Sequence, residues 1–300
     1  MNENDLKRYK KIQIYGFIFV SLFILIICFV IGYLLNRNYT LERKYNDLND
    51  KVNSNLSEIS NFDYEKDEAE FIDLEEVAFK RELKVLPDGE EYPDKQRIYL
   101  TFDDGPGKYT NELLDILEEY GVKATFFVIY QPNHEEEYRR IVDNGHTLAI
   151  HSYDHSYKKI YKSVDGFKED IDKTYDFLLE TTGQEPLFYR FPGGSSNTIF
   201  KGNKNDLIDV LNDKNLVYYD WNCDSNDASK KALSSNQIAN NVIKGIGNKK
   251  EAIVLMHDTN AKLTSIEAVP LILDYYMEDD NVIFLPITET TEPIQHVKKK

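Results

Sequence analysis

Short apolar runs alternate with longer amphipathic segments from Arg97 onward, and this alternation restricts the fold more than any other feature of the chain. Seven runs have the composition of buried strands: Ile98–Phe102, Ala124–Ile129, Thr147–His151, Leu187–Phe191, Val217–Trp221, Ala252–His257 and Val282–Pro286. Apolar residues recur at helical spacing between the runs, as in Asn111–Tyr120, Phe167–Leu179 and Ile266–Met277. About seven strand–helix units predict an α/β fold, with a parallel sheet and helices outside it. So many units in two thirds of the chain favour a closed or nearly closed barrel over an open sheet.

Polar side chains stand at the carboxyl ends of several predicted strands. The motifs are Asp103-Asp104, His151–His155, Arg190–Gly194, Trp221–Asp227 and His257-Asp258. Because the ends of parallel strands meet at one rim of a barrel, we expect these side chains to lie together. Taken singly, each motif has an ordinary interpretation as a turn, a chance histidine pair, a rim ion pair or a core residue. Their joint arrangement at successive strand ends indicates a functional site.

The residue types in these motifs suit one kind of chemistry. Two imidazoles and a carboxylate suit a zinc-like divalent ion with one position left open for water, which such an ion makes a strong nucleophile near neutral pH. Successive side chains of a strand diverge, so one of two adjacent carboxylates can hold metal while the other takes a proton from that water. A further histidine can protonate a leaving amine, a guanidinium can hold the base through a bidentate contact, and a glycine-rich turn can offer an N–H to an oxyanion. Together these parts predict metal-assisted hydrolysis of an amide.

Five motifs, in this order, resemble those of the polysaccharide deacetylases, carbohydrate esterase family 4. They are Thr101–Pro106 (TFDDGP), His151–His155 (HSYDH), Arg190–Gly194 (RFPGG), Trp221–Asp227 and Leu255–His257 (LMH). The resemblance covers residues 95–290, which we take as the catalytic domain. It implies a distorted (β/α) barrel that removes acetyl groups from N-acetylated sugars.

The resemblance also implies a role for each residue that matches a motif position. Asp103 would be the general base and His257 the general acid. Asp104, His151 and His155 would hold the metal, which is usually zinc in this family.

Five further positions would support this chemistry. The resemblance implies that Arg190 positions the base and that Asp227 orients the general acid. The backbone N–H of Gly193 would meet the oxyanion, and Trp221 and Leu255 would wall the pocket for the acetyl methyl group.

Two departures from the family pattern touch this pocket. Asp227 is followed by Ala228, where the family often has Trp, so Trp221 could supply the apolar wall instead. Phe191 stands where Pro is frequent, and two glycines follow Pro192. Substrate shape is therefore less determined than the chemistry, for which the base, the acid and every metal ligand are present.

An apolar segment near the N-terminus predicts a membrane anchor. Ile12–Leu35 holds no charged residue, and its 24 positions are enough to cross the hydrocarbon core of a bilayer. Its length, and the absence of a small-x-small cleavage site, favour an uncleaved signal anchor over a signal peptide. Basic residues are frequent in the preceding tail, residues 1–11, so we expect a cytoplasmic N-terminus and an extracellular catalytic domain at the cell membrane.

A stalk is predicted between the anchor and the barrel, over residues 36–94. Residues 41–62 carry an approximate heptad pattern, which could form a short coiled coil and a homodimer, although a single helix or a loose spacer explains it as well. Residues 58–94 contain 14 acidic against four basic residues, as in a solvated linker. Residues 291–300 are interpreted as a C-terminal tail.

Charge and topology narrow the substrate. The chain carries 52 acidic and 36 basic residues, a net charge of -16, which gives no field for seeking nucleic acid. A deacetylase outside a bacterial membrane faces the cell wall, so we expect it to act on N-acetylglucosamine or N-acetylmuramic acid of peptidoglycan and to lower the wall's sensitivity to lysozyme.

Three alternatives remain at this stage. The substrate could be another N-acetylglucosamine polymer, such as a chitin-like oligomer or an exopolysaccharide. The anchor and heptads could instead make a membrane scaffold, whose phenotype would survive loss of the general base. Asp224–Asp227 could bind calcium, although the two histidines near Asp104 are unsuited to a hard, oxygen-preferring ion.

Overall fold

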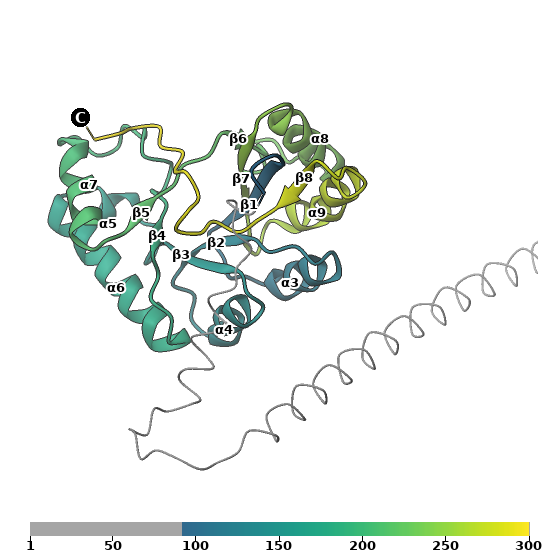
Figure 1. Cartoon of the computed structure of the whole chain (residues 1–300). Coiled ribbons are helices and arrows are strands. Elements are labelled where there is room, and N and C mark those ends of the chain that lie inside the picture. The colour runs from purple at the N-terminus through teal and green to yellow at the C-terminus, as the bar shows by residue number, and fades with distance from the viewer. Residues whose placement is uncertain (1–91, 300) are drawn as a thin grey trace, which may run out of the picture. The chain divides into compact units, whose positions relative to one another are not determined.

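A curved parallel sheet organises residues 92–299, the part of the chain that this computed structural model describes (Figure 1). Its strands are β1 Gln96–Asp103, β2 Thr125–Ile129, β3 Thr147–Ser152, β4 Phe188–Tyr189, β5 Val217–Tyr218, β6 Cys223–Asp224, β7 Glu251–His257 and β8 Val282–Phe284. Their order is β5-β4-β3-β2-β1-β7-β6, and β8 pairs with the first half of β1. No pairing joins β5 to β6 within the described range, so the sheet is a partial barrel.

The predicted parallel sheet with outer helices is therefore confirmed, as a curled sheet of the distorted-barrel kind. All seven predicted strands are present, and an eighth, β6, was not predicted because its two residues carry no periodic signal. The strands β4 and β5 are shorter than predicted. Beyond them the backbone leaves the ladder for the loops that carry Arg190 and Asp220, two residues of the site described below.

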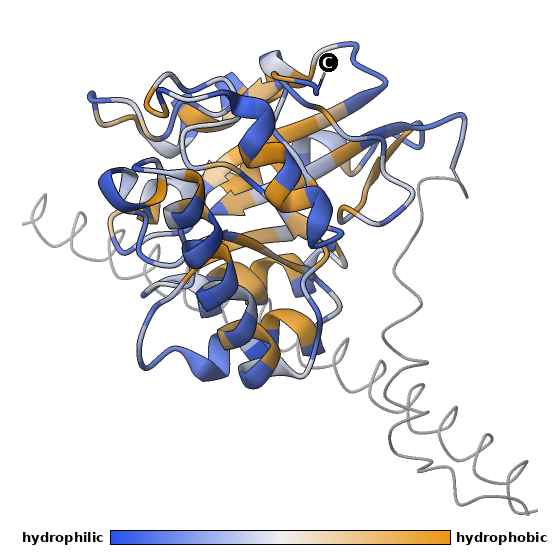
Figure 2. Ribbon diagram, turned by 90° about the vertical axis from the view of Figure 1, so that its left-hand side faces the viewer, coloured by the Kyte–Doolittle hydropathy of each residue, from blue (hydrophilic) through white to orange (hydrophobic). Residues whose placement is uncertain are grey.

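Helices cover the outer face of the sheet. They are α3 Thr110–Glu119, α4 Glu135–Asp143, α5 Tyr157–Ile160, α6 Val164–Thr182, α7 Lys204–Asp213, α8 Ser235–Ile246 and α9 Leu263–Tyr276. Figure 2 shows hydrophobic strands behind helices whose outward sides are hydrophilic, as expected for amphipathic helices on a buried parallel sheet. Local signals set the ends of α6, because the Ser163 side chain accepts from the Gly166 N–H at its start and Gly183 is left-handed at its end.

Two apolar clusters lie on opposite faces of the strands. Ile98, Leu100 and Phe102 of β1 point outward into the main core with the helices. Tyr99 points inward and packs with Phe127, Ala149, Phe188, Tyr219, Ile253, Leu285 and Ile287. Because side chains alternate along a strand, Thr101 and Asp103 share the inward face with Tyr99. The motif residues at the carboxyl ends of the strands therefore lie on the same inward face as the second apolar cluster.

The segment after β8 runs back across the sheet to the end of α7 (Figure 1, yellow). The N–H of Asp220 donates to the carbonyl oxygen of Ile294, and the N–H of His296 donates to the Asp220 carboxylate. Tyr218 donates its hydroxyl hydrogen to the carbonyl oxygen of Val297. Part of the predicted tail, residues 294–297, is thus hydrogen-bonded to the catalytic domain beside β5.

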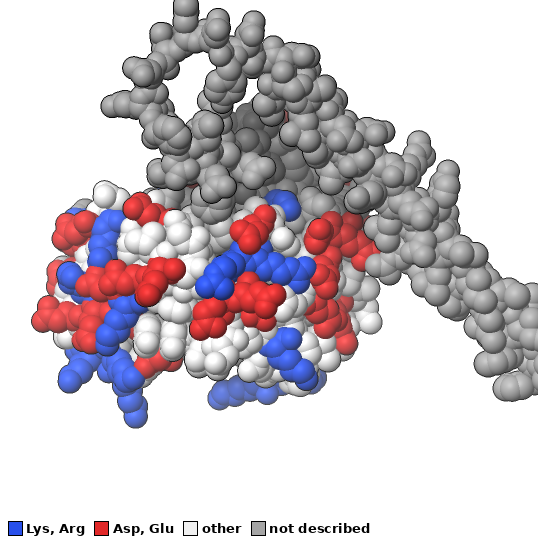
Figure 3. All heavy atoms as spheres, turned by 90° about the horizontal axis from the view of Figure 1, so that it is seen from below, with Lys and Arg blue, Asp and Glu red and all other residues white. Residues whose placement is uncertain are grey.

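The predicted anchor, residues 12–35, lies outside the described residues, as does the stalk up to residue 91. Within residues 92–299, none of the helices has both the length and the apolar character needed to span a bilayer. On the face seen in Figure 3, acidic and basic side chains are interspersed. Ion pairs such as Lys168–Asp172 and Lys173–Glu169 join side chains one turn apart on α6.

Candidate active site and metal centre

Asp103 and His257 are neighbours at the rim of the sheet. They are paired in register at the ends of β1 and β7, so their side chains leave the same face of adjacent strands. The N–H of Asp258 donates to the carbonyl oxygen of Asp103 at 2.9 Å and locks the two strand ends together. The residues that the sequence assigns to the base and the acid thus lie side by side.

Arg190 forms a buried, hydrogen-bonded ion pair with Asp103. Its guanidinium is fully buried, and its Nη1 donates to Oδ1 of Asp103 at 2.8 Å and to Oγ1 of Thr101 at 2.6 Å. Nε and Nη2 donate to the carbonyl oxygens of Tyr219 and Asp220. The expected bidentate contact with Asp103 is therefore a single hydrogen bond from Nη1, while Nε and Nη2 donate to backbone carbonyls.

This arrangement leaves the second carboxylate oxygen of Asp103 available to the site. Burial raises the pKa of Asp103, and the positive charge of Arg190 opposes that shift. A carboxylate with a raised pKa and one free oxygen is suited to accept a proton.

Asp104, His151 and His155 form a cluster next to this pair. Oδ1 of Asp104 lies 3.5 Å from Nε2 of His151 and 3.4 Å from Nε2 of His155. Ligands at 2.0–2.1 Å from a tetrahedral zinc ion lie about 3.3–3.4 Å from one another. The two separations from Asp104 therefore match a zinc-type coordination shell, and the three ligand atoms all lie within 4.8 Å of one another.

Two further observations support a metal at this cluster. Oδ1 of Asp104 is buried and has no hydrogen-bond partner within the described residues, which is costly unless a cation binds there. Nδ1 of His151 contacts the carbonyl oxygen of Arg190 at 2.8 Å, which requires that nitrogen to be the donor and leaves Nε2 with its lone pair. Burial lowers the pKa of His151 to about 3, so the ring is neutral, as a metal ligand must be.

Left-handed backbone conformations bring the cluster together. Asp104 has φ 69° and His155 has φ 52°, in a region that non-glycine residues adopt at a cost of about 1–3 kcal/mol. The change at Asp104 breaks the strand's alternation directly after Asp103. One carboxylate can then meet the histidines while its neighbour meets Arg190.

His257 is held by a buried carboxylate. Its Nδ1 lies 2.7 Å from Oδ1 of Asp227, and its backbone N–H donates to Oδ2 of Asp227. Burial lowers the pKa of His257, but the hydrogen bond and charge of Asp227 outweigh it and raise the pKa to about 9. The ring is therefore protonated at neutral pH, and its Nε2 can donate toward the site.

The three residues assigned to the oxyanion and the acetyl pocket lie around this centre. Gly193 has φ 75°, and its N–H donates no hydrogen bond within the described residues. Leu255 is paired in register with Thr101, one inward position before His257. Trp221 packs on the next glycine, Gly194, where a Cβ would lie 3.1 Å from the indole ring.

Several contacts of the site were not predicted from the sequence. Ser265, in the first turn of α9, donates to Oδ2 of Asp227 at 2.7 Å across 38 residues of chain. Tyr157 places its hydroxyl beside Gly193. Serines and tyrosines are too common for their type alone to mark such contacts, and only the fold brings them to the site.

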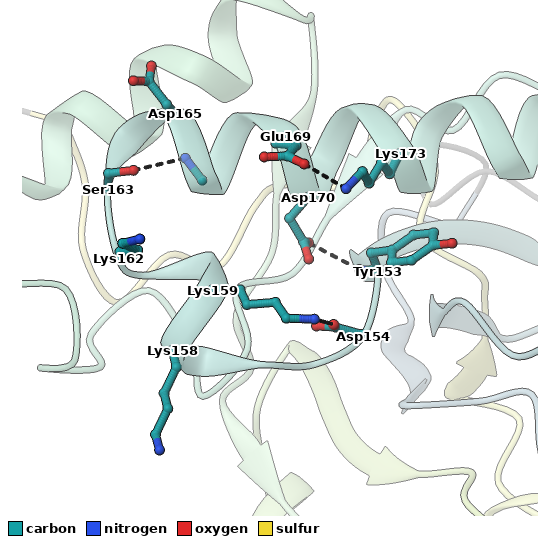
Figure 4. Close-up of a pocket in the computed structure, with 11 residues that line it drawn as sticks. Tyr153, Asp154, Lys158, Lys159, Lys162, Ser163, Asp165, Glu169, Asp170 and Lys173 are labelled. Atoms are coloured by element: carbon teal, nitrogen blue, oxygen red, sulfur yellow. Dashed lines mark hydrogen bonds and ion pairs between the residues drawn. The ribbon is translucent and has the colours of Figure 1, made fainter.

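A polar cavity of about 560 Å³ adjoins the turn between the two histidine ligands (Figure 4). Four of its eight charged lining residues pair with one another, Lys159 with Asp154 and Lys173 with Glu169. Asp170 accepts a hydrogen bond from the backbone N–H of Tyr153. These contacts join Tyr153 and Asp154 of the turn to α5 and α6.

Comparison with known proteins points to one family. The model of the polysaccharide deacetylase family matches residues 90–213, a range that includes the first three motifs. Among curated proteins, a peptidoglycan-N-acetylglucosamine deacetylase of Bacillus cereus is 34% identical over 196 residues, which cover 63% of this chain and 69% of that protein.

Solved structures agree with this assignment. The catalytic domain of a peptidoglycan N-acetylglucosamine deacetylase from Eubacterium rectale is 39% identical, with a TM-score of 0.66, and the match covers 69% of this chain and 96% of that domain. A polysaccharide deacetylase from Bacillus cereus is 30% identical, with a TM-score of 0.60 and coverage of 67% and 97%.

Proposed function

The chain belongs to the polysaccharide deacetylase family and is a hydrolase of amide bonds, and from this premise we propose that it is a metal-dependent N-deacetylase of peptidoglycan. One observation carries the proposal: the unsatisfied ligand cluster of Asp104, His151 and His155 lies directly beside the Asp103–Arg190 pair. The protonated His257 completes the set on the adjacent strand. Zinc is the ion that this donor set fits best.

The chemistry divides among a few side chains. When bound by Asp104, His151 and His155, a divalent ion supplies Lewis acidity for the acetyl carbonyl and eases ionisation of the attacking water. The free carboxylate oxygen of Asp103 accepts a proton from that water while the water oxygen bonds to the carbonyl carbon. Asp103 needs no rearrangement for this step, because Arg190 already holds its other oxygen.

His257 completes the hydrolysis. Its Nε2 gives a proton to the amide nitrogen as the carbon–nitrogen bond breaks, which yields acetate and a free amino sugar. Asp227 stabilises the imidazolium before that transfer and keeps Nδ1 as the inner donor. The Gly193 N–H is free to donate to the carbonyl oxygen while negative charge develops on it.

The wall substrate follows from the predicted topology and from the relatives. We propose that Ile12–Leu35 anchors the chain in the cell membrane with its N-terminus inside, and that residues 36–94 carry the domain outward to the wall. Two of the similar proteins are named for peptidoglycan N-acetylglucosamine. Deacetylation would leave free amines, make the wall more cationic and reduce its cleavage by lysozyme.

The direct test is acetate release by the full chain in detergent, loaded with zinc. Three substrates are compared: peptidoglycan, a chitin-type oligomer and poly-N-acetylglucosamine. We expect acetate from peptidoglycan and none from the His151→Ala variant. Release from no glycan, or full activity of His151→Ala, would sink the proposal. Release from the chitin-type oligomer or poly-N-acetylglucosamine alone would reassign the glycan and leave the chemistry standing.

The topology has its own test. Protease added to intact cells is expected to remove the catalytic domain while a tag at the N-terminus stays protected. A domain that resists protease until the cells are lysed would contradict the extracellular placement.

A further inference from the structure

Tyr157 stands next to the metal-ligand cluster although no catalytic motif includes it. It is the first residue of α5, two positions after His155, and the two rings lie 5.1 Å apart between centroids. The side chain is half-buried, and its phenol is close enough for the charges of Asp104 and Asp103 to act on it. Its position is therefore on the wall of the reaction centre.

The hydroxyl of Tyr157 lies beside Gly193. A Cβ at Gly193 would lie 3.0 Å from the Tyr157 Oη and 3.6 Å from Cζ. Cβ and the backbone nitrogen of a residue are bonded to the same Cα, so the hydroxyl lies in the neighbourhood of the N–H proposed to meet the carbonyl oxygen. Glycine at 193 thus serves two needs, the left-handed φ and the space that the phenol occupies.

The protein groups around this hydroxyl leave it without a partner in the described part of the chain. Within residues 92–299 it forms no hydrogen bond, whereas the nearby Tyr161 donates its own to the carbonyl oxygen of Pro192 at 2.8 Å. A phenol is a hydrogen-bond donor with an ordinary pKa near 10, so it carries its proton at neutral pH. Tyr161 has a structural partner, and Tyr157 has a donor left for a ligand.

We propose that the Tyr157 hydroxyl is a second oxyanion donor, which hydrogen-bonds the acetyl carbonyl oxygen together with the Gly193 N–H during amide hydrolysis. The inference rests on the proposed function and adds a catalytic residue to it. As the water oxygen bonds to the carbonyl carbon, the carbonyl π pair moves onto oxygen, and the phenol donates a hydrogen bond without losing its proton. The bond is stronger in the transition state than in the ground state, so it accelerates turnover.

The test compares Tyr157→Phe with two matched variants of the full chain, using acetate release from the glycan that the parent deacetylates. Tyr120→Phe removes a hydroxyl that donates to the exposed Asp274, at the end of the outer helix α3. Tyr161→Phe removes the structural hydroxyl beside the same loop. For Tyr157→Phe we expect kcat about a hundredfold lower, with KM, zinc affinity and Tm unchanged.

The controls separate this result from a structural effect. Tyr120→Phe should match the parent, and Tyr161→Phe should lower Tm because it removes the shorter of the two hydrogen bonds to the buried Pro192 carbonyl oxygen. An unchanged kcat in Tyr157→Phe, a raised KM at constant kcat, or a loss of zinc affinity would each overturn the inference while parental activity upholds the proposed function. A parent that releases no acetate would overturn both.

Discussion

The two sides of the reaction centre differ in how fully the protein satisfies them. On one side, the metal-ligand cluster of Asp104, His151 and His155 has a buried oxygen without a partner and two residues in left-handed conformations. On the other side, Arg190 donates to two side chains and two backbone carbonyls, and its positive charge is matched by Asp103.

This difference separates binding from preorganisation. The metal-ligand cluster needs a bound ion to satisfy its buried oxygen. Its two residues in left-handed conformations are already strained before the ion binds. The Asp103–Arg190 pair needs nothing more and is part of the inner core. Changes to the cluster should therefore remove chemistry and spare the fold, whereas changes to the pair should damage both.

The largest expected effect comes from the adjacent carboxylates, which can be exchanged for amides of the same shape. Asp104→Asn should lose both zinc binding and measurable acetate release. Asp103→Asn should keep zinc and lower kcat by about 10²–10⁴-fold, because only the proton acceptor is lost. Isothermal titration with zinc and an acetate assay measure the two properties. If both variants lose zinc equally, the division between the two sides is wrong.

The second effect is on stability. Arg190→Met should lower the free energy of unfolding by about 3–5 kcal/mol, because it leaves Asp103 buried without its cation. Metal-free Asp104→Asn should stay within about 1 kcal/mol of the metal-free parent, because its Oδ1 accepts no hydrogen bond in the described residues. Urea unfolding can be followed by Trp221, the only tryptophan of the chain. The double variant Arg190→Met with Asp103→Leu should recover part of the loss, and a parent-like Arg190→Met would contradict the argument.

The same contrast explains what could be predicted from the sequence. Asp103 and His257 could be placed at strand ends on one rim because apolar runs reveal strands and their ends, whereas the pairing of their two strands is known only from the structure. Their contacts with Arg190 and Asp227 were expected from the resemblance, but the further contacts that hold Arg190 and Asp227 could not be predicted. The Tyr219 and Asp220 carbonyls that occupy the Arg190 donors have no side-chain signal, and Ser265 reaches Asp227 only through the packing of α9. The strand β6 was missed for a related reason, since two residues show no period.

The third effect concerns pH. The pKa of His257 in the folded protein is about 9, above its ordinary value of 6.5, so the active acid is lost as pH rises through about 9. Protonation of His257 also stabilises the folded state. This stabilisation is complete below about pH 6.5 and is lost as the pH rises to about 9. Asp227→Asn should lower the alkaline limb of kcat/KM by about 1–3 pH units, because it removes the charge that outweighs burial.

A milder change to the same carboxylate provides the control. Ser265→Ala keeps the charge of Asp227 and removes one hydrogen bond, so it should shift the alkaline limb less than Asp227→Asn does. An alkaline limb that stays in place in Asp227→Asn would assign the titration to another group.

The smallest effect should come from the C-terminal segment, residues 294–300. It adds hydrogen bonds to Asp220, on the Asp103–Arg190 side of the centre. The buried Asp220 carboxylate accepts from the N–H and hydroxyl of Ser195 and from the N–H of His296, while its carbonyl holds Arg190. Deleting residues 294–300 removes one of these donors, so we expect a loss of about 1–3 kcal/mol in unfolding free energy and a severalfold lower kcat. Deleting only residues 298–300 should change neither.

Zinc affinity distinguishes the two sides once more. Over residues 294–299 the deleted segment hydrogen-bonds to Asp220, Tyr218, Ser195, Trp221 and Asp209, and none of these five is a metal ligand. Zinc should therefore bind the shortened chain as tightly as the parent, although catalysis is slower. The opposite result would be weak zinc binding with an unchanged kcat per bound zinc. It would show that the C-terminal segment supports the metal-ligand cluster and not the Asp103–Arg190 pair.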